Sequence, residues 1–169
     1  NDWREANPNI VKLWSDVERA AKNAVSYGTE FETCKGSFKL VNGDLLFKLP
    51  SKRILSFPNA KIQPSDRGVE LVYEGMNNHI HKWGQIKAYG GSLVQSITQA
   101  VARDVLAEAV LRLERADYPV VLHVHDEIIG DVPNDHGSLA EFEALMCELP
   151  TWAKGLPVTA EGYESKRYR

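Results

Sequence analysis

The apolar positions near the start of the chain predict a helix. Between Pro8 and Tyr27 they recur every three or four residues, which places them on one face of a helix. They are Ile10, Leu13, Trp14, Val17, Ala21 and Ala24. Asn7 is a favourable N-cap before Pro8, and Gly28 after Tyr27 is a common stop signal. We therefore expect an amphipathic helix within residues 1–30 that packs one face on a core.

The spacing changes after this helix, where apolar and polar residues alternate from Phe31 to Ile62. A period of two is typical of a strand with one buried face. Asn42-Gly43 lies between two such runs and is a strong signal for a two-residue hairpin turn. We expect a small meander of about three strands within a β region covering 31–75, whose last part is a strand near Gly68–Tyr73. Residues 77–91 indicate an irregular connection.

A second amphipathic helix is predicted between Ser92 and Arg115. Ser92 followed by Gln95 has the spacing of a capping box. The predicted buried face consists of Leu93, Ile97, Val101, Val105, Ala109 and Leu113. On another face Gln95, Gln99 and Arg103 follow one another at intervals of four residues, which gives a polar line along the helix. Such a line is most often a solvated surface.

Residues 118–133 contain two apolar, β-branched runs around a polar centre, His125-Asp126-Glu127. This pattern predicts a hairpin with Asp126 and Glu127 at or beside its tip. The apolar flanks are expected to be buried and to hold the base of the hairpin; they are Val120, Leu122, Val124, Ile128 and Val132. A carboxylate fixed at such a tip can present a metal ion to a phosphate, although Asp is also common in turns without any chemistry.

The last third of the chain completes the predicted fold. Ser138 followed by Glu141 has capping-box spacing before a short apolar helix, and the alternation from Leu156 to Tyr163 indicates a final strand. We expect an α+β fold in which an antiparallel sheet contains the 118–133 hairpin and the final strand, backed by the helix at 92–115. We treat 1–169 as a single domain, with the helices and hairpin of 89–169 as its main part.

Composition narrows the class of protein. A chain of 169 residues at 43% hydrophobic supports one domain with a core. The net charge of −3 argues against a nucleic-acid binder that relies on bulk electrostatics. Local basic stretches do occur, at Lys48, Lys52, Arg53, Lys61 and Arg67 and in the tail Lys166-Arg167-Tyr168-Arg169.

Cysteine usage and hydropathy indicate the setting. Cys34 and Cys147 lie far apart and form neither a disulfide framework nor a metal-binding pair, and no apolar run approaches the length of a membrane span. We expect a soluble, cytoplasmic protein that does not contact a membrane. The chain begins at Asn1 rather than Met, which indicates part of a longer polypeptide, a processed product or a missing beginning.

The hairpin stretch resembles motif C of the family A DNA polymerases, the family of bacterial DNA polymerase I. Other segments resemble the same family in the family's order, with phage-type members the most similar. These segments are Trp3-Arg4-x-x-Asn7-Pro8-x-Ile10-Val11-x-x-Trp14, the stretch from Leu49 to Asn59 with Lys52 in place of the usual Gly, Gln99-Ala100-x-Ala102-x-Asp104, and the ending from Trp152 to Tyr168. The resemblance covers nearly the whole chain and implies the carboxyl-terminal palm portion of a template-directed DNA polymerase.

This resemblance implies roles for the hairpin residues. Asp126 would be a catalytic carboxylate and a ligand of a two-metal Mg²⁺ site. Glu127 would support catalysis near the metals and the primer end, although neighbouring residues of a regular strand point to opposite faces. His125 would contact the DNA near the primer terminus.

The resemblance also implies contacts to the primer–template DNA. Gln99 would lie on the minor-groove side of the duplex, where an amide can donate to acceptors that every base pair offers. Gln95, one turn earlier, would share this role, and we expect Arg53 in the matched basic stretch to contact the DNA as well.

Two other parts of such a polymerase have no match in this chain. The family's second catalytic Asp belongs to motif A, and its nucleotide-binding Arg, Lys and Tyr belong to motif B. One carboxylate cannot assemble a two-metal site, so we expect the chain alone to be nearly inactive. Its expected partners are the primer–template DNA, a dNTP and the remaining polymerase portion, in replication or repair.

Two alternatives stay open. His123-x-His125 and His79-x-His81 are pairs with the spacing of one strand face, which could hold zinc in a metal-dependent hydrolase. The second alternative is a non-catalytic module that binds DNA or a partner subunit.

Overall fold

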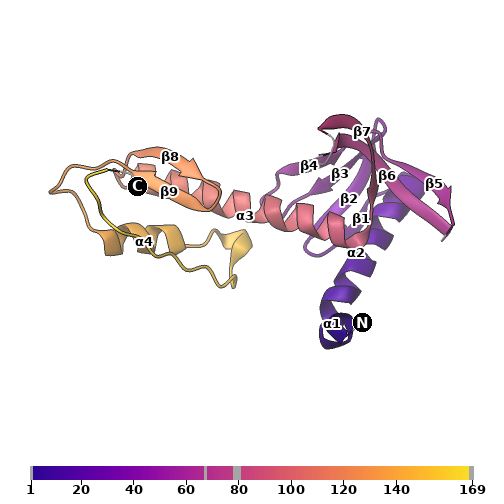
Figure 1. The fold of residues 1–169 in the computed structure, drawn as a ribbon, viewed down its shortest axis with the longest axis horizontal. Helices are drawn as coiled ribbons and strands as arrows, with labels where there is room; N and C mark the ends of the chain where they lie inside the picture. Colours follow the sequence, from indigo (N-terminus) through magenta and orange to yellow (C-terminus); the bar gives the residue numbers. More distant parts are fainter. Residues whose placement is uncertain (1, 67, 78–80, 168–169) are drawn as a thin grey trace. The chain divides into compact units, whose positions relative to one another are not determined.

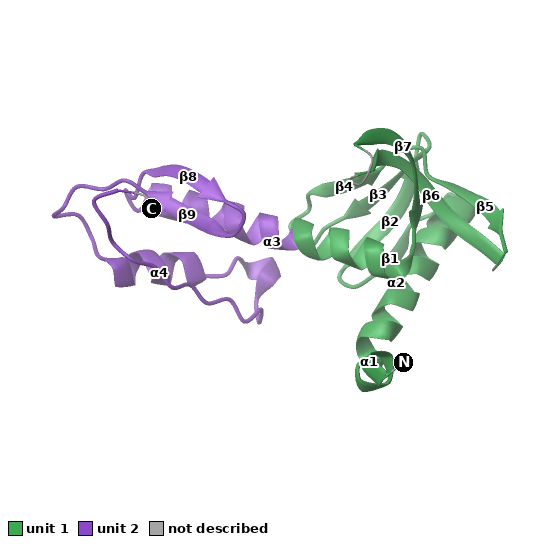
Figure 2. Ribbon diagram, viewed as in Figure 1, with its two compact units in different colours: residues 1–100 green, residues 101–169 purple. Residues whose placement is uncertain are grey.

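The computed structural model describes residues 2–66, 68–77 and 81–167 and has an α+β fold (Figure 1). The fold class predicted from the sequence is thereby confirmed. The chain divides into two compact units, unit 1 at residues 1–100 and unit 2 at residues 101–169 (Figure 2). The sequence interpretation treats 1–169 as one domain, and this boundary stays a prediction.

Unit 1 begins with two helices, α1 (Asp2–Ala6) and α2 (Pro8–Tyr27). α2 has the predicted bounds, and Gly28 ends it with a left-handed φ of 67°. Asn7 takes the N-cap position, but its side-chain amide donates to the carbonyl oxygen of Trp3 (2.9 Å) rather than capping α2. The buried face of α2 consists of Val17, Ala20, Ala21 and Ala24.

The first sheet of unit 1 has four antiparallel strands, one more than expected. They are β1 (Phe31–Thr33), β2 (Gly36–Val41), β3 (Asp44–Lys48) and β4 (Ile54–Phe57), in that order across the sheet. Asn42 and Gly43 have positive φ angles of 52° and 91°, so the predicted hairpin turn is confirmed. Cys34 and Lys35 form a second two-residue turn with positive φ, between β1 and β2.

The second sheet consists of β5 (Lys61–Ser65), β6 (Gly68–Asn77) and β7 (Lys82–Ala88), with β6 in the middle. β6 confirms the strand predicted near Gly68–Tyr73 and extends it. β7 lies where the sequence indicated an irregular connection, so that prediction was wrong. β7 pairs with β6 from Leu71 opposite Ala88 to Asn77 opposite Lys82. This pairing forms a strand that the local pattern of apolar and polar residues does not predict.

The core of unit 1 lies between α2, the sheets and the start of α3 (Gly90–Arg115). Its largest fully buried side chains are Val17, Phe38, Leu45, Phe47, Leu71, Val72 and Leu93. The rings of Phe38 and Phe47 pack with their centroids 4.6 Å apart. α3 begins at Gly90, and the predicted capping box is absent because Ser92 bonds back to the Tyr89 backbone instead of Gln95.

α3 continues into unit 2, where Val105, Ala109 and Leu113 form its buried face as predicted. The other elements of unit 2 are β8 (Val120–Val124), β9 (Glu127–Gly130), α4 (Leu139–Cys147) and the 3-10 turn at Thr151–Ala153. Among the described helices of the chain, none is long and apolar enough to cross a membrane.

The final strand predicted at 156–163 does not form. Pro157 cannot donate to a ladder, and the N–H of Gly162 donates to the Glu143 carboxylate (2.6 Å) instead of to a neighbouring strand. The prediction that one sheet joins this strand to the hairpin was therefore wrong. β8 and β9 form a two-stranded sheet of their own.

Candidate active site

The tip of the β8–β9 hairpin is a two-residue turn made of His125 and Asp126. Val124 pairs with Glu127 and closes the ladder directly before the turn. His125 has a φ of 52°, in the left-handed region. A residue with a side chain adopts this region at a cost of about 1–2 kcal/mol, which two paired strands can hold in place. The turn therefore places Asp126 at the end of a defined backbone.

The tip residues His125, Asp126 and Glu127 are all exposed. The prediction that the flanks are buried was wrong. Leu122 and Val124 are 47% and 37% exposed, and Val120, Ile128 and Val132 are only partly buried. Strand side chains point to the two faces of a sheet, so Leu122 and Val124 are exposed because the described elements leave their face uncovered. β8 also carries an irregularity between Val120 and Leu122.

Polar contacts help to hold the base of the hairpin. The Val120 N–H donates to the Glu114 carboxylate of α3 (2.6 Å), and the Asp131 N–H donates to the Pro119 carbonyl oxygen (3.1 Å). The two ends of the hairpin are thus tied to α3 and to each other. Because these bonds lie at the base, they restrain the direction of the hairpin without covering its tip.

Tyr118 joins the hairpin to α4. Its ring is 2% exposed, and its hydroxyl donates to the Glu141 carboxylate (2.6 Å) and accepts from the Ser138 N–H (3.1 Å). The hydrogen bond to the Glu141 carboxylate, together with burial, raises the pKa of Tyr118 above its ordinary value. The Ser138 hydroxyl caps α4 by accepting from the Glu141 N–H (3.2 Å), which confirms one half of the predicted capping box.

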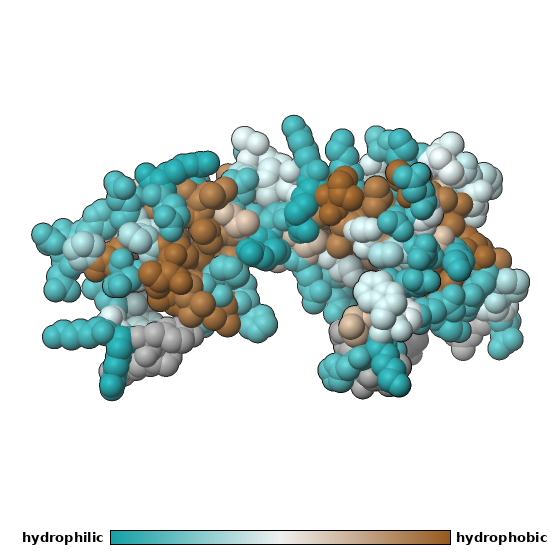
Figure 3. Space-filling view, turned by 90° about the horizontal axis from the view of Figure 1, so that it is seen from above, coloured by the Kyte–Doolittle hydropathy of each residue, from teal (hydrophilic) through white to brown (hydrophobic). Residues whose placement is uncertain are grey.

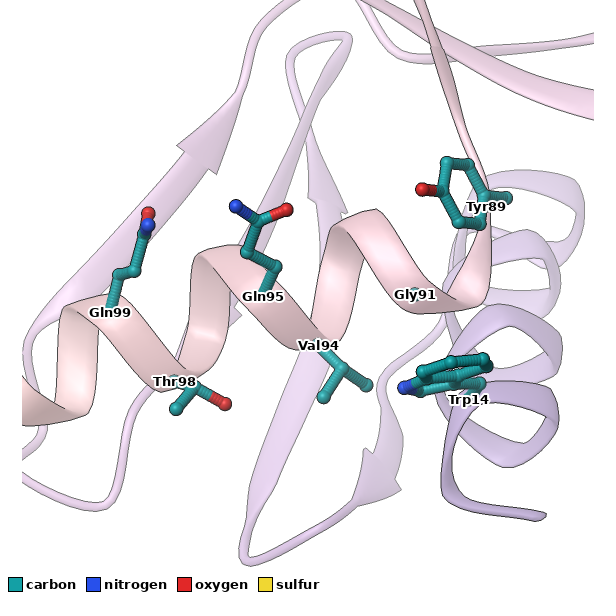
Figure 4. Close-up of a pocket in the computed structure, with 7 residues that line it drawn as sticks. All are labelled: Trp14, Tyr89, Gly91, Val94, Gln95, Thr98 and Gln99. Carbon is teal, nitrogen blue, oxygen red and sulfur yellow. The ribbon is translucent and has the colours of Figure 1, made fainter. Parts of the chain in front are cut away.

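In unit 1 the three predicted DNA contacts lie together on the surface of α3. Gln95 and Gln99 line an open groove of about 430 Å³, and their side chains leave successive turns of the helix on the same side (Figure 4). The Arg53 guanidinium donates to the Ala100 carbonyl oxygen (2.9 Å), which places Arg53 at the α3 backbone one residue after Gln99. The sequence indicated each residue separately; the shared surface comes from the fold.

The groove also contains residues that the sequence analysis did not single out as functional. Its other lining residues are Trp14, Tyr89, Gly91, Val94 and Thr98. The signal that could have identified Tyr89 is its position before Gly90-Gly91 at the start of a long helix. Two consecutive glycines at a helix start indicate a close approach of another part of the chain.

The donor atoms at the hairpin fit a hard cation better than zinc. The carboxylates of Asp126 and Glu127 offer exposed oxygen ligands, which Mg²⁺ prefers. Within residues 2–66, 68–77 and 81–167, no group of three His, Cys, Asp or Glu side chains could hold a metal ion. These described residues therefore bring together at most a partial site. His79 of the second His pair lies outside the described residues. The same is true of Asn1, and of three residues of the basic stretches, Arg67, Tyr168 and Arg169.

The chain is similar to a DNA polymerase of Bacillus phage SP02. The two sequences are 45% identical over 170 residues, which covers 99% of this chain and 26% of the phage protein. The chain thus spans about a quarter of the length of the curated relative that it matches. No protein-family model matches the chain, and no solved structure matches it. The predicted relationship to a phage DNA polymerase is confirmed, while family A membership and the palm assignment stay predictions.

Proposed function

We propose that the chain is the carboxyl-terminal palm portion of a family A DNA polymerase that extends a primer on a DNA template. One observation carries the proposal. Asp126 stands at an exposed two-residue turn of a hairpin, in a chain that is 45% identical to a phage DNA polymerase over 99% of its length. Fixed backbone and open solvent are what a carboxylate needs to bind a metal ion and a phosphate together.

The proposed reaction is nucleotidyl transfer, in which the primer 3′-hydroxyl attacks the α-phosphorus of a dNTP and pyrophosphate leaves. Asp126 would hold Mg²⁺, which when bound lowers the pKa of the hydroxyl and stabilises the charge of the leaving group. Glu127 is the first residue of β9, so its side chain leaves the backbone in a different direction from that of Asp126 and supports the site from beside it. Gln95, Gln99 and Arg53 would hold the primer–template.

The active site requires groups beyond those that the described residues of this chain bring together. A second carboxylate and the residues that bind the dNTP would come from the remaining polymerase portion. The surface of β8 is consistent with a contact to this remaining portion, because Val121, Leu122 and Val124 are all exposed. Figure 3 shows apolar side chains gathered over the part of unit 2 that carries β8. Large apolar side chains that gather on a surface are typical of a face that another protein segment covers.

The proposal can be tested with a chimeric polymerase. The matching 170 residues of the Bacillus phage SP02 protein are replaced by this chain, and extension of a labelled primer is measured with Mg²⁺ and all four dNTPs. The chimera should extend the primer. Asp126→Asn should lower the rate at least about a thousandfold because it removes charge that stabilises the metal.

Asp135→Asn is the matched control, since Asp135 is another exposed carboxylate of unit 2 that lies away from the hairpin turn. It should leave the rate within about twofold of the parent. Primer extension that survives Asp126→Asn would contradict the proposed role. An inactive chimera that still binds the primer–template would favour a non-catalytic DNA-binding module.

A further inference from the structure

The aromatic ring of Tyr89 is exposed on a backbone that is held in place. The ring is 62% exposed. The Tyr89 N–H donates to the Ser92 hydroxyl (3.0 Å), and the Tyr89 carbonyl oxygen accepts from the same hydroxyl (2.8 Å) and from the Leu93 N–H (3.0 Å). A large ring on a fixed backbone loses little conformational freedom when a ligand stacks on it.

Two glycines, Gly90 and Gly91, leave room for the contact between α3 and α2 and for the Tyr89 ring. A Cβ at Gly90 would lie 2.1 Å from the Trp14 carbonyl oxygen, so only glycine lets the start of α3 lie against α2. The Gly90 N–H donates to the Glu18 carboxylate of α2 (2.8 Å), which fixes the contact. A Cβ at Gly91 would lie 2.7 Å from the Cε2 atom of Tyr89, so Gly91 leaves the space that the ring occupies.

The groove next to Tyr89 is neutral. None of its seven lining residues carries a charged side chain. Its walls are aromatic and aliphatic, and the Trp14 ring is itself stacked on Trp3 with the centroids 5.6 Å apart. Gln95 adds an amide on the same side of α3 as Tyr89 (Figure 4). A neutral groove with a stacking ring and an amide suits the base of a nucleotide rather than its phosphate.

We propose that this groove binds an unpaired nucleobase of the DNA, with Tyr89 stacking on its face, beside the duplex that Gln95 and Gln99 would contact. A base inside a duplex has both faces covered by its neighbours, so an exposed ring can stack there only on a base that has left the duplex. Stacking uses the face of a base rather than its hydrogen-bonding edge, so the site has no strong sequence preference. The inference rests on the proposed function, since it requires that the chain binds DNA.

The test is binding of the 169-residue chain to three fluorescent DNAs, measured by fluorescence anisotropy. The first is a blunt duplex, the second is the same duplex with a single-stranded template extension, and the third is the single strand alone. Tyr89→Leu should weaken binding of the second and third DNAs by about tenfold because it removes the stacking ring. It should leave the blunt duplex within about twofold, and Tyr89→Phe should bind all three like the wild type.

A second pair of variants moves the ring without removing it. Gly91→Ala should push Tyr89 out of its place and weaken binding of the extended DNA, while alanine favours the helix. Gly84→Ala is the control, since a Cβ there meets nothing within 4 Å. Circular dichroism checks that each variant is folded. In the wild type, 2-aminopurine in the extension should lose fluorescence on binding, and Tyr89→Leu should restore it.

The outcomes separate the inference from the proposed function. Wild-type binding of all three DNAs with no selective loss in Tyr89→Leu would overturn the nucleobase site and leave the DNA-binding proposal intact. An extension base whose fluorescence does not change on binding would overturn it as well. If the chain binds none of the three DNAs, both the nucleobase site and the proposed duplex contacts are overturned.

Discussion

The two units of the chain are stabilised in different ways. Seven of the largest fully buried side chains belong to unit 1, whereas unit 2 contributes Leu113 to that set within the described part of the chain. In unit 2 the proposed catalytic hairpin has exposed apolar side chains and is held by polar contacts of Tyr118 and Glu114. Unit 1 thus has a packed apolar core, whereas the main feature of unit 2 is an exposed hairpin turn at His125 and Asp126.

The largest expected effect is a core truncation that breaks one unit only. Phe47→Ala should destabilise unit 1 by about 3–5 kcal/mol because it removes a fully buried ring and leaves a cavity. Leu122→Ala, at an exposed position of β8, should change the free energy of unfolding by about 0.5 kcal/mol or less. Urea unfolding followed by circular dichroism measures both. Equal losses would show that the hairpin packs as tightly as the core.

The next effect concerns the polar network of unit 2. Gly137 has a φ of 59°, and a Cβ there would lie 1.8 Å from the Tyr118 hydroxyl oxygen. Gly155 has a φ of 95° with nothing within 4 Å of a Cβ. Gly137→Ala should therefore cost about 2–3 kcal/mol, and Gly155→Ala about 1 kcal/mol from backbone strain alone. A difference near zero in urea unfolding would mean that the Tyr118 contact is unimportant.

The sequence predicted the helices, strands and turns better than it predicted which of their faces are buried. Local signals sufficed for α2, the Asn42-Gly43 turn and the hairpin tip, because period, caps and turn residues act within a few positions. β7 was missed because its pairing with β6 is not local, and the strand at 156–163 was predicted from alternation that finds no partner. Burial of Leu122 was wrongly expected since alternation gives a face but not a neighbour.

In the candidate site, too, local features could be predicted from the sequence and contacts between distant residues could not. The exposure of Asp126 was predicted from the turn pattern, and the left-handed backbone of His125 was not, because few residues other than glycine have a positive φ. The grouping of Arg53 with Gln99 depends on a hydrogen bond between residues 47 positions apart. Tyr89 was overlooked since a single aromatic residue has no pattern of its own.

A smaller effect is expected at the tip. His125→Gly should stabilise unit 2 by about 0.5 kcal/mol, because the relief of about 1–2 kcal/mol of strain is partly offset by the greater freedom of glycine when unfolded. The same variant should lower primer extension by the chimera, since a freer turn holds Asp126 less well. Thermal unfolding and extension rates measure the two effects. A loss of stability would show that the histidine ring makes a contact worth more than the strain.

The smallest effect is a dependence on alkaline pH. Because the pKa of Tyr118 is raised in the folded state, its bond to Glu141 stabilises unit 2 fully below the ordinary tyrosine value of about 10. The contribution is lost as pH rises through the raised value. Wild-type unfolding midpoints should fall more steeply above this pH than those of Tyr118→Phe, which lacks the hydroxyl. Parallel pH curves of the two proteins would contradict this assignment.

The turn between β1 and β2 bears Cys34, and the last residue of α4 is Cys147. The chain has two cysteines, so each unit contains one. Cys34 is exposed, and desolvation of its thiol raises the pKa of this group. A maleimide dye on each of the two thiols would label each unit once. Energy transfer between the dyes would report any change in the distance between the two units when DNA is added, with no engineered residue in the chain.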